Sequence, residues 1–180
     1  MKRKLSVVIA AFVFTALILV LGYISFGFWT TFIFTSGFLG GFILWLIIPS
    51  NVPFERIKVP FWTAFALFLL HRVEEKYLKF FDKLAEITGV VTPEILSFSV
   101  ITLVLLSVGA WLAVPFAVKR GYALGYYLAW TFFAAMGITE LAHFVFPLFG
   151  NEPYGYFPGM ASVVLLAPIA WWGMYRLAGK

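Results

Sequence analysis

Apolar runs long enough to cross a bilayer follow one another along almost the whole chain, and only short polar connections separate them. An α-helix needs about 20 mainly apolar residues to span the hydrocarbon layer, where only helices and closed barrels satisfy their backbone polar groups. Of the 180 residues, 63% are hydrophobic and only 12% are charged, unlike the usage of a soluble domain. The sequence therefore predicts an all-α polytopic membrane protein, with residues 1–180 as a single domain embedded in the lipid bilayer.

The expected bundle contains about six transmembrane helices, bounded by charged or proline-containing breaks. Their ranges, in chain order, are Leu5–Phe28, Trp29–Ile48, Val59 through the His71 region, Ile95–Val118, Tyr122–Phe146 and a last span that follows Pro158 and continues to Tyr175. Residues 55–58 form a charged turn, and Pro60 suits the first turn of the third helix. Beyond Glu75 the pattern becomes amphipathic, which is typical of a helix that enters the membrane interface.

Three glycines in the second span, Gly37, Gly40 and Gly41, offer points where another helix can approach closely. The alternative is that they are ordinary glycines of a membrane helix, where this residue is frequent. The sequence leaves both interpretations open.

The distribution of positive charge predicts the orientation of the bundle. Six spans place both termini on one side, and nine of the 13 Lys and Arg residues fall there: Lys2, Arg3, Lys4, Arg56, Lys58, Lys119, Arg120, Arg176 and Lys180. The positive-inside rule therefore predicts cytoplasmic termini, in the plasma membrane if the source is prokaryotic. Because the net charge of +5 is scattered over short loops beside apolar runs, we expect no nucleic-acid partner.

Both histidines of the chain have a glutamate three residues away. On a helix His71, Glu74 and Glu75 stand at i, i+3 and i+4 and share one face. Glu140 and His143, in the fifth span, are also three apart. Because the third and fifth spans run in the same direction, both groups fall near the outer side of the membrane. Ionisable residues at such depth are costly unless they find partners, so a shared functional site is the leading hypothesis.

Imidazole and carboxylate groups are ligands of zinc, iron or manganese, and a Glu-x-x-His pair is used in di-iron carboxylate bundles. The chain contains no cysteine, so a thiolate site is excluded. Two histidines with three glutamates fall short of the usual dinuclear set, and a mononuclear site fits as well. We therefore predict a site for a divalent transition metal, zinc or iron, with the ligands His71, Glu74, Glu75, Glu140 and His143.

Less specific interpretations stay open for both groups. The His71 region also fits a solvated helix end, in which Glu75 and Lys79 form an i, i+4 ion pair. Glu140 and His143 also fit a hydrogen-bonded pair that only stabilises helix packing. The shared site is favoured because carboxylates rarely lie in apolar spans without a function.

A short motif, Tyr156-Phe157-Pro158-Gly159, precedes the last span. Pro158 fits the first turn of a helix, and Gly159 allows close approach of the backbone. We expect Tyr156 to hold its hydroxyl over the outer mouth of the bundle, where it would orient a substrate or a water molecule. The alternative is a tyrosine of the interfacial aromatic belt.

Three marks together resemble the HXXEE family of integral membrane proteins. The stretch His71-Arg72-Val73-Glu74-Glu75 matches the motif that names the family, His143 matches its second histidine, and the tetrapeptide from Tyr156 to Gly159 matches its Tyr-x-Pro-Gly motif. They span residues 71–159, about half of the chain. The resemblance implies an integral membrane protein in which these residues matter, but it implies no reaction, substrate or metal.

The sequence thus favours a membrane-embedded metal-dependent enzyme, a hydrolase or an oxidase or hydroxylase, that acts on a lipid-like or apolar substrate. Glu75 would be a further ligand or the general base, and Tyr156 would orient the substrate. The main alternative is a small transporter or a proton or ion relay that uses the same residues, and a third is a structural membrane protein. The oligomeric state is left open.

Overall fold

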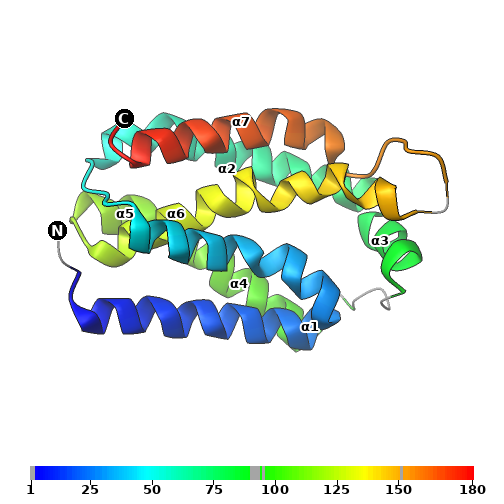
Figure 1. Cartoon of the computed structure of the whole chain (residues 1–180), viewed down its shortest axis with the longest axis horizontal. Coiled ribbons are helices and arrows are strands. Elements are labelled where there is room, and N and C mark those ends of the chain that lie inside the picture. The colour runs from blue at the N-terminus through cyan, green and yellow to red at the C-terminus, as the bar shows by residue number, and fades with distance from the viewer. Residues whose placement is uncertain (1–2, 90–93, 95, 151) are drawn as a thin grey trace.

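The computed structural model describes residues 3–89, 94, 96–150 and 152–180. Within this part of the chain there are seven α-helices, two short 3-10 helices and no strand, which confirms the predicted all-α class. In chain order the elements are α1 (Leu5–Ile47), α2 (Phe54–Tyr77), α3 (Phe80–Thr88), α4 (Phe98–Leu112), α5 (Val114–Lys119), α6 (Ala123–Gly137), η1 (Thr139–Phe144), η2 (Phe146–Phe149) and α7 (Met160–Leu177). Figure 1 shows the long helices lying along the longest axis of the molecule, with α3 at the end opposite the two chain termini.

Four helical segments of the described residues are long and apolar enough to cross a membrane. They are Leu5–Phe28, Phe98–Lys119, Ala123–Phe149 and Met160–Leu177, and the segment Thr35–Ile47 is apolar but shorter. Their length and composition are compatible with an integral membrane protein. α2 carries more charge than these segments, and it packs against α7.

α1 is a helical hairpin, not one straight rod. Gly27 has φ 73° and ψ 179°, outside the helical region, and the chain reverses there (Figure 1). The two arms are antiparallel, because the rings of Phe12 and Phe42 lie 6.2 Å apart and Arg3 donates to a carbonyl near the end of the second arm at 3.2 Å. The predicted boundary after Phe28 therefore coincides with the observed turn, where glycine supplies the positive φ.

α2 begins earlier than predicted. It starts at Phe54, so residues 55–58 belong to the helix and do not form a separate turn, and Pro60 lies in the helix interior, not in its first turn. A proline inside a helix frees the carbonyl four residues before it. Here that carbonyl belongs to Arg56, and it accepts a hydrogen bond from Arg176 Nε at 3.1 Å. A side chain of α7 thus compensates for the proline.

α2 ends at Tyr77, and the chain changes direction at Lys79, whose φ of 55° is left-handed. The short helix α3 follows, and its buried face contains Phe80 and Leu84, which confirms the amphipathic helix predicted beyond Glu75. The predicted start of the next span, Ile95, lies outside the described residues. The following helix, α4, begins at Phe98 and is succeeded directly by α5.

Two of the three glycines in the second arm of α1 contact α6 closely. A Cβ on Gly37 would lie 2.5 Å from the Cα of Ala135, and one on Gly41 would lie 2.5 Å from the amide nitrogen of Thr131. Gly40 faces open space. The close-approach interpretation is therefore confirmed for Gly37 and Gly41, and Gly40 is an ordinary helix residue.

The predicted fifth span is not α-helical to its end. α6 stops at Gly137, and Glu140 and His143 lie in the 3-10 helix η1. A continuing α-helix would need the carbonyl of Gly137 to accept the amide of Leu141. Instead Trp171 Nε1 of α7 donates to this carbonyl at 2.6 Å, and the Leu141 amide bonds to a nearer carbonyl. The contact with α7 thus favours tighter winding just before the candidate site.

Candidate metal centre

α2 places one histidine and one glutamate on the face that it turns toward the bundle. His71 and Glu75 are four residues apart, and they are 0% and 4% exposed. With 3.6 residues per turn they lie on one face, while Arg72 and Glu74 fall on its two flanks. Both flanking side chains are partly exposed.

η1 supplies the second histidine and glutamate. Residues three apart in a 3-10 helix are directly aligned, because this helix has three residues per turn. Glu140 and His143 therefore project together, with His143 Nε2 3.3 Å from Glu140 Oε2, and both residues are buried. The switch from α-helix to 3-10 helix thus improves the alignment that the sequence spacing predicted.

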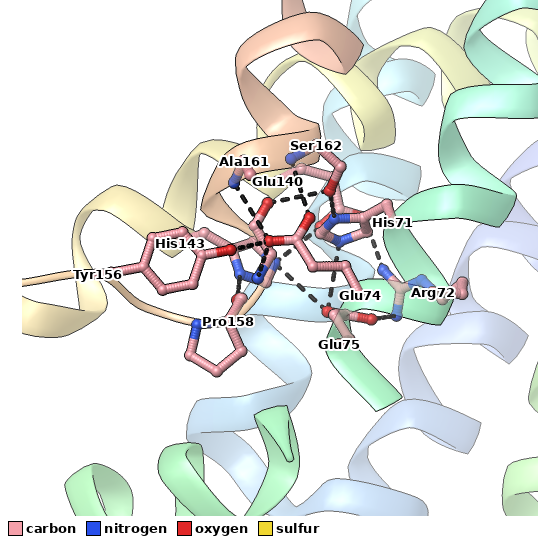
Figure 2. A network of polar contacts seen from close by, with 11 residues as sticks. His71, Arg72, Glu74, Glu75, Glu140, His143, Tyr156, Pro158, Ala161 and Ser162 are labelled. Atoms are coloured by element: carbon pink, nitrogen blue, oxygen red, sulfur yellow. Dashed lines mark hydrogen bonds and ion pairs between the residues drawn. The ribbon is translucent and has the colours of Figure 1, made fainter. Parts of the chain in front are cut away.

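Atoms of the two pairs converge on one point (Figure 2). His71 Nε2 lies 3.3 Å from Glu75 Oε1 and 3.2 Å from Glu140 Oε2, and His143 Nε2 lies 3.4 Å and 3.3 Å from the same two oxygens. All four atoms lie within 4.8 Å of one another. Ligands about 2.0–2.1 Å from a tetrahedral metal ion would be roughly 3.3 Å apart. We call these four residues the histidine–glutamate cluster; it is buried and could hold a metal ion.

The hydrogen bonds of both histidines place a proton on Nδ1. His143 Nδ1 lies 2.5 Å from the carbonyl oxygen of Pro158, which can only accept. His71 Nδ1 lies 2.8 Å from Ser162 Oγ, and this hydroxyl already donates to the Gly159 carbonyl at 3.1 Å, so Oγ accepts from the imidazole. In a neutral imidazole the other nitrogen then carries the lone pair, so both Nε2 atoms are available as ligands.

These Nε2 atoms face carboxylate oxygens. His71 Nε2 and Glu75 Oε1 are buried and have no hydrogen-bond partner, which is costly inside a protein. Lone pairs that face each other repel unless a cation or a proton lies between them. One metal ion would satisfy all four atoms at once, whereas without a metal ion each facing pair needs a proton, either on the imidazole or on the carboxyl group.

Arg72 holds both carboxylates from the side. Its Nη1 lies 2.7 Å from Glu75 Oε2, and its Nη2 lies 2.9 Å from Glu140 Oε1 (Figure 2). These are the two oxygens that point away from the centre of the cluster. Each glutamate therefore has one oxygen bound by the guanidinium and the other directed at the centre of the cluster, and the planar fork of arginine suits this double contact.

Glu74, which the sequence predicts as a ligand, lies outside the cluster. Its Oε1 accepts the amides of Gly159 at 3.0 Å and Ala161 at 3.2 Å, and its Oε2 accepts the amide of Ser162 at 2.9 Å. The hydroxyl of Tyr156 also donates to Oε1. These amides lie at the start of α7, so a carboxylate of α2 caps that helix.

Tyr156 and Gly159 enclose the cluster on the loop side. Tyr156 is 60% exposed, and partial burial together with the adjacent Glu74 carboxylate raises the pKa of its hydroxyl, which remains a donor. Gly159 has φ 99°, and a Cβ there would lie 2.8 Å from His71 Cε1 and closer still to the His143 ring. The predicted close approach at Gly159 is confirmed, and only glycine fits.

Apolar side chains surround the cluster on both sides. An outer group of buried residues consists of Phe80, Leu84, Phe146, Phe157 and Met160. The Phe80 ring lies 4.9 Å from the ring of His143, so this group covers the cluster at the loop end. Toward the other end of the bundle the buried residues include Phe61, Phe65, Phe68, Phe132, Phe133 and Leu166. Such a shell excludes water and strengthens electrostatic interactions at the site.

The fixed charges of the cluster favour a cation. Glu75 and Glu140 carry two negative charges when ionised, and Arg72 offsets one of them. Because net charge is costly in a low-dielectric interior, a bound cation would reduce this cost.

Comparison with known proteins gives no match: no family model matches the chain, and no curated protein or solved structure is significantly similar to it. The resemblance to the HXXEE family therefore rests on the motif residues. The structure brings His71, Glu75 and His143 of these motifs together with Glu140.

Three groups at the site did not emerge from the sequence analysis: the Arg72 guanidinium, the Ser162 hydroxyl and the carbonyl of Pro158. The sequence does contain a signal for Arg72, because a cationic residue that lies in the sequence between His71 and two glutamates is a natural partner for their carboxylates. Ser162 had none, because a serine two residues into a helix has many ordinary roles. Backbone carbonyls carry no sequence signal at all.

Proposed function

We propose that the protein is a membrane-embedded metal-dependent enzyme whose metal centre is the histidine–glutamate cluster. One observation carries this proposal: a partner holds the outer polar atom of each of the four residues, and the other polar atom faces the centre, where His71 Nε2 and Glu75 Oε1 have no hydrogen-bond partner. The Nδ1 atoms bind Ser162 and Pro158, and the outer carboxylate oxygens bind Arg72. Such bonds orient ligands in known metal sites.

The donor set favours zinc or iron. Structural zinc sites rely largely on cysteine, whereas histidine with carboxylate is typical of catalytic zinc and of non-haem iron. A bound ion would supply Lewis-acid activation of water or of a carbonyl or, as iron, activation of dioxygen. The proposal therefore covers two reaction classes, hydrolysis and oxidation or hydroxylation.

We assign different roles to the two glutamates of the cluster. Catalytic zinc sites commonly have three protein ligands and one exchangeable position. Glu140 would be a permanent ligand together with His71 and His143, and Glu75 would yield its position to water or substrate and then accept a proton as general base. Arg72 would keep the Glu75 carboxylate in reach by its 2.7 Å contact. Because the Tyr156 hydroxyl is engaged by Glu74, we place it at the entrance and away from the reacting atoms.

The surroundings favour a lipid-like substrate. Beside the cluster, the outer surface of α2 presents Leu69, Leu70 and Val73, which are 52%, 61% and 50% exposed. The cluster itself is buried among helices and covered by the outer apolar group. A substrate that partitions into the bilayer reaches such a site without crossing water, whereas a charged, water-soluble substrate would have to cross apolar surface.

We further propose six membrane crossings, in which the arms of α1, α2, α4 with α5, α6 with η1, and α7 each cross once. Basic residues support cytoplasmic termini, because they gather at the end of the bundle that holds the C-terminus. Lys119 Nζ lies 5.4 Å from the Phe54 ring, and Arg56 donates to the carbonyl of Lys180 at 3.0 Å. The cluster would then lie near the opposite, outer face of the membrane.

The interior of the bundle does not favour the alternative of a proton or ion relay. A relay needs polar groups or water that continue from the cluster to the cytoplasmic side. Among the described residues, the interface of α2, α6 and α7 below the cluster is filled by apolar side chains such as Phe61, Phe132 and Leu166. The enzyme hypothesis needs no such path.

Metal analysis of the purified wild-type protein, prepared without chelators, tests the proposal. We expect one zinc or iron ion per chain, and only a trace in His71→Ala and in His143→Ala. Glu152→Gln, a change in the exposed loop before α7, is the matched control and should keep the metal. A metal-free wild type that also fails to take up added zinc or ferrous iron would refute the metal centre.

Activity is tested by incubating the reconstituted protein with a membrane-lipid extract and following products by mass spectrometry. Hydrolysis divides one lipid into two products that together gain the mass of water. Hydroxylation adds one oxygen atom to an intact lipid and requires dioxygen and an electron donor. Products that form equally with wild type and Glu75→Gln would contradict the assigned role of Glu75.

A further inference from the structure

Two adjacent glutamates of α2 make entirely different contacts: Glu75 faces the cluster, and Glu74 binds the start of α7. We propose that Glu74 is a positioning residue that fixes the histidine acceptors and couples the outer loop to the metal centre. The inference rests on the proposed function, because it concerns the affinity of the same site. It assigns to Glu74 a role other than that of a ligand.

The first step is the cap itself. The amides of Gly159, Ala161 and Ser162 have no helical partner because they open α7, and the Glu74 carboxylate binds all three at 2.9–3.2 Å. Negative charge is favoured at a helix N-terminus. The cap comes from another helix, so it fixes α7 relative to α2 and does more than finish α7.

The second step links the cap to both histidines. Ser162 gives its amide to Glu74 and offers its hydroxyl oxygen to His71 Nδ1 at 2.8 Å. Pro158, one residue before the capped amide of Gly159, offers its carbonyl to His143 Nδ1 at 2.5 Å. The acceptors that hold both imidazoles in the ligand form therefore belong to the backbone segment that Glu74 binds.

The third step links the cap to the loop. The hydroxyl of Tyr156 donates to the same Oε1 that binds Gly159 and Ala161, and the ring of Tyr156 is largely exposed. Docking of the loop therefore adds a donor to the cap. A loop that moved away would take that donor with it and would loosen the segment that carries the histidine acceptors. The metal centre is complete only when the loop is docked.

Both carboxylate oxygens of Glu74 accept hydrogen bonds, so a change of one oxygen to an amide nitrogen disrupts the cap selectively. In Glu74→Gln one of the two acceptors becomes an NH2 donor, and it then opposes an N–H group of the helix start. The side chain keeps its length and shape. Ser162→Ala is the complementary variant, because it retains the amide bond to Glu74 and removes only the hydroxyl that accepts from His71.

Zinc affinity provides the main test, measured by competition with a chelating dye on the full chain in detergent. We expect Glu74→Gln and Ser162→Ala each to weaken zinc binding by about 10–100-fold, the usual effect of losing a hydrogen bond that orients a ligand. Glu152→Gln should bind as the wild type does. Zinc affinity of Glu74→Gln within twofold of the wild type would overturn the proposal.

Two spectroscopic measurements separate positioning from ligation and from general loss of structure. X-ray absorption should show the same number of nitrogen and oxygen ligands in zinc-loaded Glu74→Gln as in the wild type, whereas loss of one ligand would make Glu74 a ligand and overturn the proposal. Nitrogen NMR of zinc-loaded protein should show Nδ1–H on both histidines of the wild type and an altered His71 signal in Ser162→Ala. An unchanged His71 signal in Ser162→Ala would contradict the claim that Ser162 orients His71.

Amide exchange in the metal-free protein distinguishes a failure of this inference from a failure of the proposed function. The amides of Gly159, Ala161 and Ser162 should exchange slowly in the wild type and faster in Glu74→Gln. Slow exchange of these amides in a wild-type protein that binds no zinc would support the Glu74 cap and contradict the proposed metal-dependent enzyme. Equal exchange rates in the wild type and in Glu74→Gln would contradict the cap, even if the wild type binds zinc.

Discussion

The imidazole rings of His71 and His143 lie with their centroids 4.8 Å apart and their planes at 88° to each other. This arrangement directs the two Nε2 atoms toward the same pair of carboxylate oxygens. Two imidazolium ions at this separation would repel each other, whereas two neutral imidazoles can share one metal ion. A metal ion in the cluster would therefore compete with protons for the same atoms.

Acidification should release the metal. Each Nε2 must be unprotonated to bind a metal ion, so zinc affinity should fall as the pH falls, by up to about 100-fold per pH unit where two protons replace the ion. Zinc competition between about pH 5 and 8 measures this slope. In His143→Gln the slope should be roughly half as steep. Affinity that does not change with pH would contradict ligation by the two histidines.

Gly159→Ala should remove metal binding, because the new Cβ would overlap the rings of both histidines and the residue has φ 99°. The strain should also cost about 1–3 kcal/mol of stability. Gly155→Ala is the matched control in the same loop, because its Cβ would meet only the Pro153 carbonyl at 3.6 Å. Metal analysis and thermal unfolding check both variants. Normal zinc content in Gly159→Ala would show that the backbone can move away from the histidines.

Arg72→Leu should destabilise the metal-free protein by about 2–3 kcal/mol, less than the ~3–5 kcal/mol of a fully buried ion pair because the Arg72 side chain is 34% exposed. The loss leaves Glu75 and Glu140 without their shared partner. Added zinc should recover much of the stability, since it neutralises the same carboxylates. The stability of Arg72→Lys should lie between those of the wild type and Arg72→Leu, because an ammonium group cannot bind both carboxylates as a planar guanidinium does. Thermal unfolding with and without zinc measures these effects. A metal-free Arg72→Leu protein as stable as the wild type would contradict them.

Gly41→Ala should destabilise the bundle by about 1–3 kcal/mol, because α1 and α6 would have to separate to admit a Cβ that lies 2.5 Å from the amide nitrogen of Thr131. Gly40→Ala, on the next residue, faces open space and should be neutral or slightly stabilising. Thermal unfolding in the same detergent compares the two. Equal melting temperatures would mean that the two helices are not closely packed in solution.

Most of the helical architecture could be predicted from the sequence, because apolar runs and their breaks report directly on membrane helices. The break near Phe28 and the amphipathic helix with Phe80 and Leu84 are examples. Two local errors have a common cause. Pro60 is tolerated inside α2 because Arg176 binds the freed carbonyl, and α6 ends at Gly137 because Trp171 binds its carbonyl. Both depend on side chains of α7, distant in sequence.

The site was predictable in part for a similar reason. Helical spacing shows that His71, Glu74 and Glu75 share a broad face, but it does not show which glutamate points to the partner helix. The structure resolves this, because Glu75 joins Glu140 and Glu74 meets the start of α7. Which side chain meets which neighbour depends on how α2 is rotated in the bundle, and rotation leaves no local signal in the sequence.

The order of assembly follows from the distribution of the site along the chain. His71 and Glu75 come from α2, Glu140 and His143 from η1, and the groups that orient the imidazoles lie between Pro158 and Ser162, at the start of the last helix. During synthesis the complete ligand environment therefore cannot exist before α7 has been made and has packed against α2. If the cluster holds a metal ion as proposed, that ion can meet the complete set of oriented ligands only after α7 has been made.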